Sequence, residues 1–371
     1  MKIGFEAKRV FHNKTGLGNY SRDLIRILAN FFPENDFLLY NPEPSNEILF
    51  KNTNANVFEK LPATPFYQKF YNLWRQIGVV KDLKKDGIEL FHGISGEIPW
   101  GLRQNNIKSV VTIHDLIFVR YPELYSFFDR KIHFYKFKKA AKDANLIIAI
   151  SEQTKRDIEL FLKIPSEKIQ VIYQGCQSVF KKEYSETEKQ KVRQKFNLPN
   201  EFILNVGTLE ERKNALTLVK AIKEIDTKLV LVGKKTTYTQ QIRQYIKENG
   251  IEEKVIFLKG LSSEELAITY QLATVFVYPS IFEGFGIPII EALFSKTPVI
   301  TTNYGVFPEA GGPNSMYIDP MNEQEIKSKI EFLLQNEAVR HDMAQKGLEY
   351  AAKFKDDVIA KQVMDCYTSL I

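Results

Sequence analysis

The sequence predicts an α/β protein built from two similar halves. Short apolar runs of strand length alternate with amphipathic segments of helical period along the chain, which is typical of βαβ units around a parallel sheet. At 371 residues the chain is longer than one hydrophobic core commonly serves, so we expect two domains. In open parallel sheets ligands bind beyond the carboxyl ends of the strands, so functional residues are expected in the loops that follow strands.

The first half carries six expected strands, each short and apolar: residues 2–7, 37–40, 88–92, 110–114, 145–150 and 169–173. Helices fit between them, and Ser151 is a candidate N-cap for a helix over 152–162. A polar run over 181–190 then predicts no strand and marks the expected crossing between domains. The first domain is therefore placed at 1–178.

The second half repeats the alternation of strands and helices. Its expected strands cover 202–206, 228–232, 255–258, 275–278 and 299–302. Its expected helices cover 214–225, 238–249, 263–272, 287–294 and 323–334. The second domain is placed at 179–351, and two α/β domains predict a ligand cleft between them.

Composition and charge exclude several classes of protein. The net charge of +6 is too small for a dedicated nucleic-acid-binding protein, but it fits an anionic substrate or a membrane surface. Cys176 and Cys366 lack the spacing of metal ligands, which excludes a zinc site and favours a reducing cytoplasm. Because the sequence shows neither a secretory signal nor an apolar run of about 20 residues, we expect a cytoplasmic protein, with membrane contact, if any, peripheral on the inner face.

The first strand leads to two glycines, Gly16 and Gly18, at the start of a predicted helix. Free amide groups at a helix N-terminus suit an anion. A dinucleotide fingerprint would need a third glycine where Ser21 stands, and an acidic residue after the next strand, where Asn41 follows Tyr40. The dinucleotide interpretation is therefore disfavoured, and a turn that needs glycine for backbone reasons stays open as the alternative.

The second candidate loop places Arg212 and Lys213 after a strand and before a helix, with Asn214 as the expected N-cap. Arg grips phosphate with its planar fork and Lys adds a point charge. Exposed pairs of this kind are usually solvated. Two cations at the N-terminal end of a helix, where the macrodipole disfavours them, favour an anionic ligand instead.

The third candidate segment, residues 283–291, is the most specific. Glu283 precedes a predicted helix and Glu291 lies one turn inside it. Gly284 and Gly286 allow backbone amides to approach a ligand, and Pro288 suits the first helical turn. Carboxylates accept hydrogen bonds from vicinal hydroxyls, so the pair suits a ligand with two polyols, such as a ribose and a sugar.

The fourth candidate is His114, which ends a β-branched run beside Asp115 at the expected cleft. A lone histidine is usually structural, but this position favours a role in the site. His92 is a similar but weaker candidate.

Together these segments resemble the retaining nucleotide-sugar glycosyltransferases of family 4, whose GT-B fold has two Rossmann-like domains that face each other across a cleft. Residues 283–291 match the family's E-x7-E signature, 206–214 its phosphate-binding stretch and 151–157 its S-x-x-[ST]-K-x-D-like segment. The resemblance implies an N-terminal acceptor domain and a C-terminal nucleotide-sugar donor domain. It also implies a final helix, at about 352–371, that packs back on the first domain.

The resemblance also implies roles for the candidate residues. Arg212 and Lys213 would hold the donor diphosphate, and Glu291 the ribose. Glu283, with the backbone after it, would hold the transferred sugar. The donor-binding residues implied in this way are Gly16, Gly18, Thr208, Arg212, Lys213, Glu283, Phe285, Gly286, Ile287 and Glu291. Those expected to act in catalysis are His114, Glu283, Arg212 and Lys213.

Two further positions follow from the same comparison. Gly16 would approach the diphosphate from the other domain, and His114 would contact the transferred sugar and assist at the reacting centre. Thr208 departs from the pattern, because many relatives carry Arg after the glycine that closes this strand. The departure bears on donor and acceptor details more than on the chemistry.

The implied reaction moves a hexose, with mannose from GDP-mannose as the suggested donor, to a saccharide or lipid-linked saccharide in cell-surface polysaccharide or glycan synthesis. It would retain the anomeric configuration by front-face attack, without a metal or a cofactor, since no Asp-x-Asp motif follows a strand. The alternatives are a catalytically inactive sugar-nucleotide-binding subunit and a related GT-B synthase or phosphorylase.

Two aromatic segments bear on the acceptor. Phe66, Phe70, Trp74 and Ile77 share one helical stripe, for which core packing is expected. Core packing is also the default for residues 127–139, although their basic and aromatic mixture leaves contact with anionic lipid open.

Overall fold

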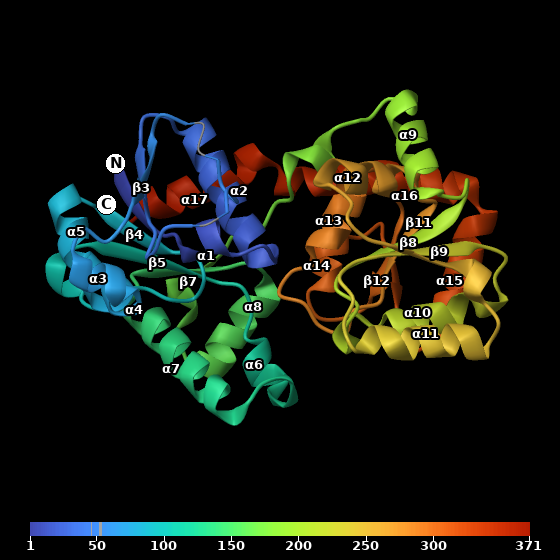
Figure 1. The fold of residues 1–371 in the computed structure, drawn as a ribbon, viewed down its shortest axis with the longest axis horizontal. Helices are drawn as coiled ribbons and strands as arrows, with labels where there is room; N and C mark the ends of the chain where they lie inside the picture. Colours follow the sequence, from blue (N-terminus) through green and yellow to red (C-terminus); the bar gives the residue numbers. More distant parts are fainter. Residues whose placement is uncertain (46, 52–53) are drawn as a thin grey trace. The chain divides into compact units, whose positions relative to one another are not determined.

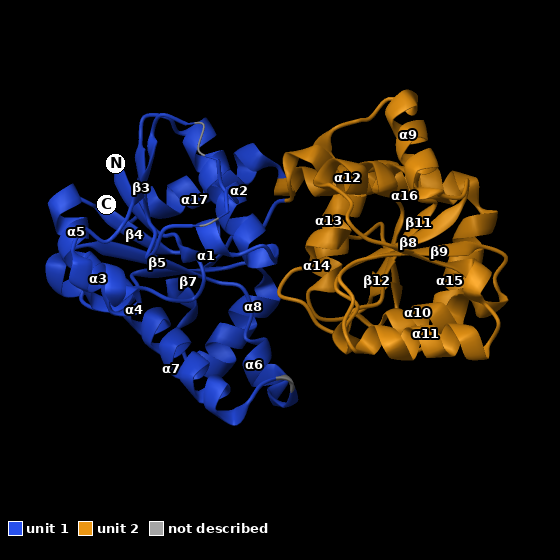
Figure 2. Ribbon diagram, in the orientation of Figure 1, with its two compact units in different colours: residues 1–175, 355–371 blue, residues 176–354 orange. Residues whose placement is uncertain are grey.

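The computed structural model describes residues 1–45, 47–51 and 54–371. They form two compact units (Figure 2). Unit 1 consists of Met1–Gly175 and Lys355–Ile371, and unit 2 of Cys176–Phe354. The boundaries predicted from the sequence fall at 178 and about 351.

Unit 1 is built on a seven-stranded parallel sheet in the order β3-β2-β1-β4-β5-β6-β7 (Figure 1). Its strands are β1 (Lys2–Glu6), β2 (Asp36–Tyr40), β3 (Val57–Lys60), β4 (Leu90–Gly93), β5 (Lys108–Ile113), β6 (Leu146–Ala149) and β7 (Ile169–Val171). Its α-helices are α1 (Lys8–His12), α2 (Gly16–Phe31), α3 (Pro65–Lys69), α4 (Tyr71–Leu73), α5 (Val79–Asp86), α6 (Ile117–Arg120), α7 (Phe127–Asp143), α8 (Glu152–Asp157) and α17 (Asp356–Thr368).

The sheet of unit 1 has a hydrophobic core on each face. One core packs α2 and α17 against the sheet, with Leu28 and Tyr367 in contact with the same cluster as Phe5. The other core packs α5 and α7 against the opposite face, through Leu83 and Ala141 among others. Burial on both faces explains why the central strands are continuous apolar runs.

Unit 2 is built on a six-stranded parallel sheet in the order β10-β9-β8-β11-β12-β13. Its strands are β8 (Phe202–Val206), β9 (Lys228–Val232), β10 (Val255–Leu258), β11 (Val275–Tyr278), β12 (Val299–Thr302) and β13 (Met316–Ile318). Its α-helices are α9 (Glu186–Phe196), α10 (Ala215–Ala221), α11 (Tyr238–Glu248), α12 (Ser263–Leu272), α13 (Ile287–Phe294), α14 (Phe307–Gly311), α15 (Glu323–Gln335) and α16 (Glu337–Ala351). The predicted α/β class with two parallel-sheet halves is confirmed.

The local predictions were less accurate at the edges. β3 and β13 were missed, because one is half exposed and the other has only three residues. The polar run over 181–190 contains the start of α9, whose N-terminus is a capping box formed by Ser185 and Glu188. Ser151 caps α8 as predicted. Asn214 occupies the N-cap position of α10, but its side chain caps no backbone amide, because its Oδ1 accepts from the Thr217 hydroxyl and its Nδ2 donates to the Pro320 carbonyl.

The core prediction for the aromatic stripe over 66–77 is wrong in three of four positions. Trp74 is buried in the core, and its indole donates a hydrogen bond to Asp82. Phe66, Phe70 and Ile77, by contrast, are about half exposed. Helical periodicity identified a common face but could not show whether another element covers it.

The described part of the chain contains no helix that is both long and apolar enough to cross a membrane.

Candidate functional site

The candidate residues of unit 2 lie at the carboxyl ends of β8 and β11. Arg212 and Lys213 occupy a 3-10 turn, Glu211–Lys213, that follows β8 and precedes α10. Glu283 lies in the loop between β11 and α13. The two loops are tied together by backbone, because the Ile281 amide donates to the Arg212 carbonyl over 2.8 Å. The sheet topology therefore brings together two segments that are about 70 residues apart in the chain.

Four donors converge on one oxygen of Glu283. Arg212 Nη1 lies 2.8 Å from Glu283 Oε1, and Lys213 Nζ also donates to this atom. The hydroxyls of Tyr278 and Ser280 donate to it as well, each over 2.9 Å. The Glu283 side chain is also only 13% exposed. One oxygen is therefore anchored by the protein.

The charges in this cluster set one another's protonation. Burial alone raises the pKa of Glu283, but the positive charges of Lys213 and Arg212 outweigh it and lower that pKa to about 2. Burial lowers the pKa of Lys213, and the neighbouring Glu283 charge opposes the shift. For Arg212 the carboxylates prevail over burial and the pKa is raised. Glu283 is therefore ionised at neutral pH and lies against the side chains of Arg212 and Lys213.

Glu291 has a different environment, although it belongs to the same motif. It lies inside α13, where the Tyr270 hydroxyl of α12 donates to its Oε2 over 3.0 Å. Burial raises the pKa of Glu291 to about 7, against the opposing effect of that hydrogen bond. A carboxyl group that gains its charge near neutral pH is suited to accept hydrogen bonds from ligand hydroxyls.

The N-terminus of α13 completes the cluster in unit 2. Gly286 precedes the helix with φ of +107°, a conformation that disfavours any residue with a side chain. Ile287 begins the helix and Pro288 follows in its first turn. Phe285 is buried against Phe354, with ring centroids 5.5 Å apart. In the first turn of α13 Pro288 has no amide hydrogen and the Ile289 amide donates to the Gly286 carbonyl over 2.9 Å, so an anion or an oxygen bound at this helix end would meet the amides of Gly286 and Ile287.

The two glycines of unit 1 differ in what they do. A Cβ at Gly18 would lie 1.9 Å from the Asn13 carbonyl oxygen, so glycine is required there by the fold. A Cβ at Gly16 would meet no atom within 4 Å. The backbone explanation that the sequence left open thus accounts for Gly18 but not for Gly16, whose surroundings leave room for a ligand.

His114 follows β5 and is buried, with both ring nitrogens bonded inside unit 1. Its Nε2 lies 2.9 Å from the Ile94 carbonyl oxygen and must donate to it, while Nδ1 accepts from the Gln174 amide at 2.8 Å. Burial lowers the pKa of His114 to about 4, so the ring is neutral at physiological pH. The imidazole is held in one tautomer and is poorly placed to act as a base.

The segment over 151–157 contacts the backbone of His114 and helps to hold it in position. Ser151 caps α8, and the Thr154 hydroxyl donates to the backbone carbonyl of His114 over 3.0 Å. Asp157 is buried and binds Arg120 through both carboxylate oxygens. This motif therefore acts as a support for the position of His114.

His92 is structural in this fold. Its two nitrogens bond with the Tyr367 hydroxyl of α17 at 2.6 Å and with Thr112 at 2.8 Å. Burial lowers its pKa to about 3. The ring is a neutral link between β4, β5 and the C-terminal helix.

Several residues of these clusters escaped prediction from the sequence. Tyr278 and Ser280 flank the β11 end and could have been suspected from their closeness to Glu283. Tyr270 and Gln174 come from distant segments and carry no sequence signal of their own. Thr208, which was singled out, is half buried, and its backbone carbonyl accepts from the Glu210 amide.

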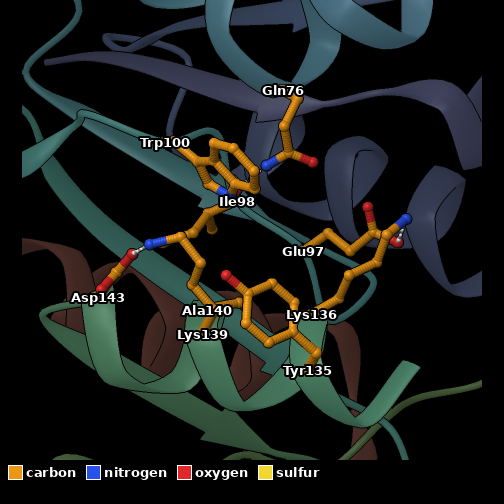
Figure 3. Close-up of a pocket in the computed structure, with 9 residues that line it drawn as sticks. All are labelled: Gln76, Glu97, Ile98, Trp100, Tyr135, Lys136, Lys139, Ala140 and Asp143. Atoms are coloured by element: carbon orange, nitrogen blue, oxygen red, sulfur yellow. Dashed lines mark hydrogen bonds and ion pairs between the residues drawn. The ribbon is translucent and has the colours of Figure 1, made fainter. Parts of the chain in front are cut away.

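A pocket on unit 1 lies between α7 and the π-helical turn Trp74–Gly78 (Figure 3). The indole of Trp100 lies at one side of it, and the Lys139 ammonium lies 5.5 Å from the centroid of that ring. Lys136 lies 3.4 Å from Glu97 at the other side. Aromatic and hydrogen-bonding side chains thus line a shallow site on this unit.

The described residues include no group of three or more His, Cys, Asp or Glu side chains able to hold a metal ion. Metal independence stays a prediction.

Comparison with known proteins identifies related sequences for both units. The family "Glycosyltransferase Family 4" matches residues 15–177, and "Glycosyl transferases group 1" matches residues 186–350. O-antigen chain mannosyltransferase B of Escherichia coli is 28% identical over the full length of both chains. O-antigen chain mannosyltransferase RfbU of Salmonella typhimurium is 30% identical over 69% of this chain and 68% of its own.

Solved structures show the same fold. Sucrose-phosphate synthase of Thermosynechococcus elongatus has a TM-score of 0.81 at 23% identity, covering 100% of this chain and 99% of its own. HepE of Anabaena, solved in complex with UDP, has a TM-score of 0.79 at 19% identity and covers all of both chains. These likenesses confirm the expected GT-B fold.

Proposed function

The chain belongs to the glycosyltransferases of group 1 and family 4, and from that premise we propose that it transfers a hexose from a nucleotide-diphosphate sugar with retention of configuration. The observation that carries the proposal is the cluster of Arg212, Lys213 and Glu283 at the carboxyl ends of two neighbouring strands. Unit 2 would bind the donor and unit 1 the acceptor. Because two relatives that match most of the chain are mannosyltransferases, we take GDP-mannose as the first donor to test.

Each donor group has a partner of suitable chemistry in unit 2. Arg212 and Lys213 would bind the diphosphate through charge-assisted hydrogen bonds. Glu291 would accept from the ribose hydroxyls, and Glu283, anchored through Oε1, would offer Oε2 to a sugar hydroxyl. The amides of Gly286 and Ile287 would bind the sugar or phosphate oxygens. In unit 1 we assign a backbone contact with the donor to Gly16, and a fold-determining role to Gly18.

The protonation states favour front-face transfer. In that reaction the bond from C1 to the diphosphate oxygen breaks, the acceptor oxygen bonds to C1 from the same side, and its proton passes to a diphosphate oxygen. Glu283, with a pKa of about 2, is a weak base, and His114 has both nitrogens engaged. The protein's contribution is then to stabilise the charge of the departing diphosphate, which Arg212 and Lys213 supply without a metal.

We place the acceptor on or near a membrane surface, as expected for a lipid-linked saccharide. Phe127, Phe128, Ile132 and Tyr135 of α7 are all more than half exposed. Basic side chains lie among them, and Lys131 and Arg130 are within 6 Å of the Phe127 ring centroid. The turn Trp74–Gly78, which carries the exposed Ile77, adjoins α7, because Gln76 and Tyr135 line the same pocket. Apolar side chains interleaved with cations fit an anionic lipid surface.

Vesicle sedimentation tests the membrane contact. Wild-type protein is expected to sediment with vesicles that contain phosphatidylglycerol and to stay in solution with neutral phosphatidylcholine vesicles. Phe128→Glu should abolish the sedimentation. Phe332→Glu places the same substitution at an exposed position of α15 in unit 2 and should not. Equal behaviour of the two variants would refute the assignment of this surface.

A transfer assay tests the proposed chemistry. The protein is incubated with GDP-mannose, and separately with UDP- and ADP-sugars, in the presence of mannoside acceptors and membrane lipid extract. We expect one donor to be consumed and the product to keep the donor's anomeric configuration by NMR. An inverted product would contradict retention. Binding of a donor without transfer or hydrolysis would favour the inactive sugar-nucleotide-binding subunit. Release of sugar 1-phosphate from a saccharide and inorganic phosphate, with no nucleotide sugar present, would favour a phosphorylase.

A further inference from the structure

A second carboxylate, outside the E-x7-E motif, contacts Arg212, one of the two cations proposed to bind the diphosphate. Glu210 lies just before the turn that carries Arg212, and its Oε1 accepts from Arg212 Nη2 over 2.7 Å. Arg212 Nη1 is held at the same time by Glu283 and by the Phe282 carbonyl. The guanidinium therefore lies between two carboxylates.

The charged side chains of this cluster balance one another before a diphosphate binds. Arg212 and Lys213 supply two positive charges, and Glu210 and Glu283 supply two negative ones. The four side chains together are neutral before any ligand binds. A diphosphate that binds these cations must therefore compete with at least one carboxylate, since phosphate oxygens and carboxylate oxygens use the same guanidinium hydrogens.

Of the two carboxylates, Glu210 is the one that can leave. Glu283 is 13% exposed and is bonded by Tyr278, Ser280 and both cations. The Glu210 side chain is 39% exposed, and in the described part of the chain its only side-chain partner is Arg212. When Glu210 leaves Arg212, the Glu210 carboxylate becomes solvated by water. Displacing Glu283 would instead break four contacts of a buried carboxylate.

We propose that Glu210 occupies the phosphate position on Arg212 in the free protein and is displaced by the donor diphosphate, so that it sets the affinity for nucleoside diphosphate. The inference rests on the proposed function. In the free state Glu210 keeps Arg212 oriented. After transfer it competes with the leaving nucleoside diphosphate and so favours its release.

Glu210→Gln tests the competition, because it keeps the shape and removes the charge. Isothermal titration with GDP and UDP measures the dissociation constant. Removal of one competing exposed charge should tighten binding of the nucleoside diphosphate that the wild type prefers, by about three- to tenfold. Glu210→Asp keeps the charge on a shorter side chain, so its dissociation constant should lie between those of the wild type and Glu210→Gln.

Glu211→Gln is the matched control. Glu211→Gln removes the same charge one position further along the chain. Glu211 is exposed, and in the described part of the chain it forms no ion pair with Arg212. Its dissociation constant should stay within about twofold of the wild type, since exposed charges that make no contact are screened. Far-ultraviolet circular dichroism and melting temperature confirm that both variants are folded.

The outcomes separate this inference from the function on which it rests. Unchanged or weaker binding by Glu210→Gln, with normal binding by the wild type, overturns the competition and makes Glu210 a positioning residue for Arg212. Equal tightening in both Gln variants also overturns it, because the effect would then come from net charge alone. A wild type that binds no nucleoside diphosphate overturns the proposed function together with this inference.

Discussion

The loops at the carboxyl ends of β5 in unit 1 and β8 in unit 2 both follow strands of a parallel sheet, yet they carry different chemistry. After β5 in unit 1, His114 is neutral and its polar atoms are bonded within the protein. After β8 in unit 2, Arg212 and Lys213 are charged and converge on a carboxylate. The difference supports the proposed division of roles, in which charged groups of unit 2 bind the donor diphosphate and a fixed neutral ring of unit 1 contacts hydroxyl groups.

Loss of a cation in unit 2 should have the largest effect. Lys213→Ala removes a charge from the diphosphate site and leaves Glu283 with one fewer counter-charge. We expect the transfer rate to fall about a thousandfold and nucleoside diphosphate binding to weaken with it. Steady-state rates and calorimetric titration of the same preparation measure both. Lys259→Ala, at an exposed position of unit 2, is the control, and undiminished diphosphate binding by Lys213→Ala would contradict the assignment.

Loss of the neutral ring in unit 1 should act on turnover alone. His114→Ala removes a fixed surface without changing the charge of the diphosphate site, so we expect kcat to fall about 10- to 100-fold with little change in donor binding. Gln174→Ala should reproduce part of the loss, because it frees the imidazole to rotate. Transfer assays quenched at set times measure kcat, and nucleotide titration measures donor binding separately. A large loss of donor affinity in His114→Ala would show that the two units do not divide the work in this way.

Glu291 should make donor binding depend on pH. Its pKa of about 7 in the free protein means that it is half protonated at neutral pH, whereas ribose hydroxyls prefer the ionised form. Affinity for a nucleotide sugar should thus fall about tenfold between pH 8 and pH 6. Nucleotide sugar is the right probe, because its diphosphate has no terminal phosphate that titrates in this range. Glu291→Gln should remove the dependence, and an unchanged slope in that variant would assign the titration elsewhere.

The same group should affect stability with a defined sign. Its pKa in the folded state lies above the ordinary value of about 4.3, so folding is favoured at low pH and loses that contribution as pH rises from about 4.3 to 7. Glu291→Gln should therefore melt at a higher temperature than the wild type at pH 8, and the gap should narrow toward pH 5. A constant gap across this range would contradict the raised pKa.

The two glycines of unit 1 should give the smallest but cleanest contrast. Gly18→Ala should destabilise the protein by about 1–3 kcal/mol, because its Cβ meets the Asn13 backbone. Gly16→Ala should fold normally and yet bind donor several-fold more weakly. Thermal melts and titration of the pair test this. Equal stability loss in both variants would remove Gly16 from the site.

The sequence was most informative where both faces of a strand are buried. The four central strands of unit 2, β8, β9, β11 and β12, were predicted at their observed bounds, because a strand covered by helices on both sides is a continuous apolar run. β3 was missed because Phe58 and Glu59 are exposed at the sheet edge. Phe66, Phe70 and Ile77 were predicted to be buried but are exposed. Their periodicity shows that they share one face, but it does not show whether another element packs against that face.

The site was predictable to the extent that it follows strands in short motifs. Arg212, Lys213 and Glu283 stand out because charged residues follow apolar runs, and the structure brings them together. Their hydrogen-bonding partners were not predictable. Tyr270 comes from another helix and Gln174 from beyond β7, and only the three-dimensional contacts show that one holds Glu291 and the other His114. The charge state of His114 was equally hidden, because it depends on burial.

The most direct test of the central claim compares a nucleoside diphosphate with its own nucleoside. Thermal shift and calorimetric titration are run with GDP, UDP and ADP, and then with guanosine, uridine and adenosine at the same concentrations. If unit 2 binds the donor chiefly through charge, one diphosphate raises the melting temperature clearly, its nucleoside hardly does so, and the difference shrinks with added salt. Equal shifts from nucleoside and diphosphate, or none from any of the six, would contradict the account.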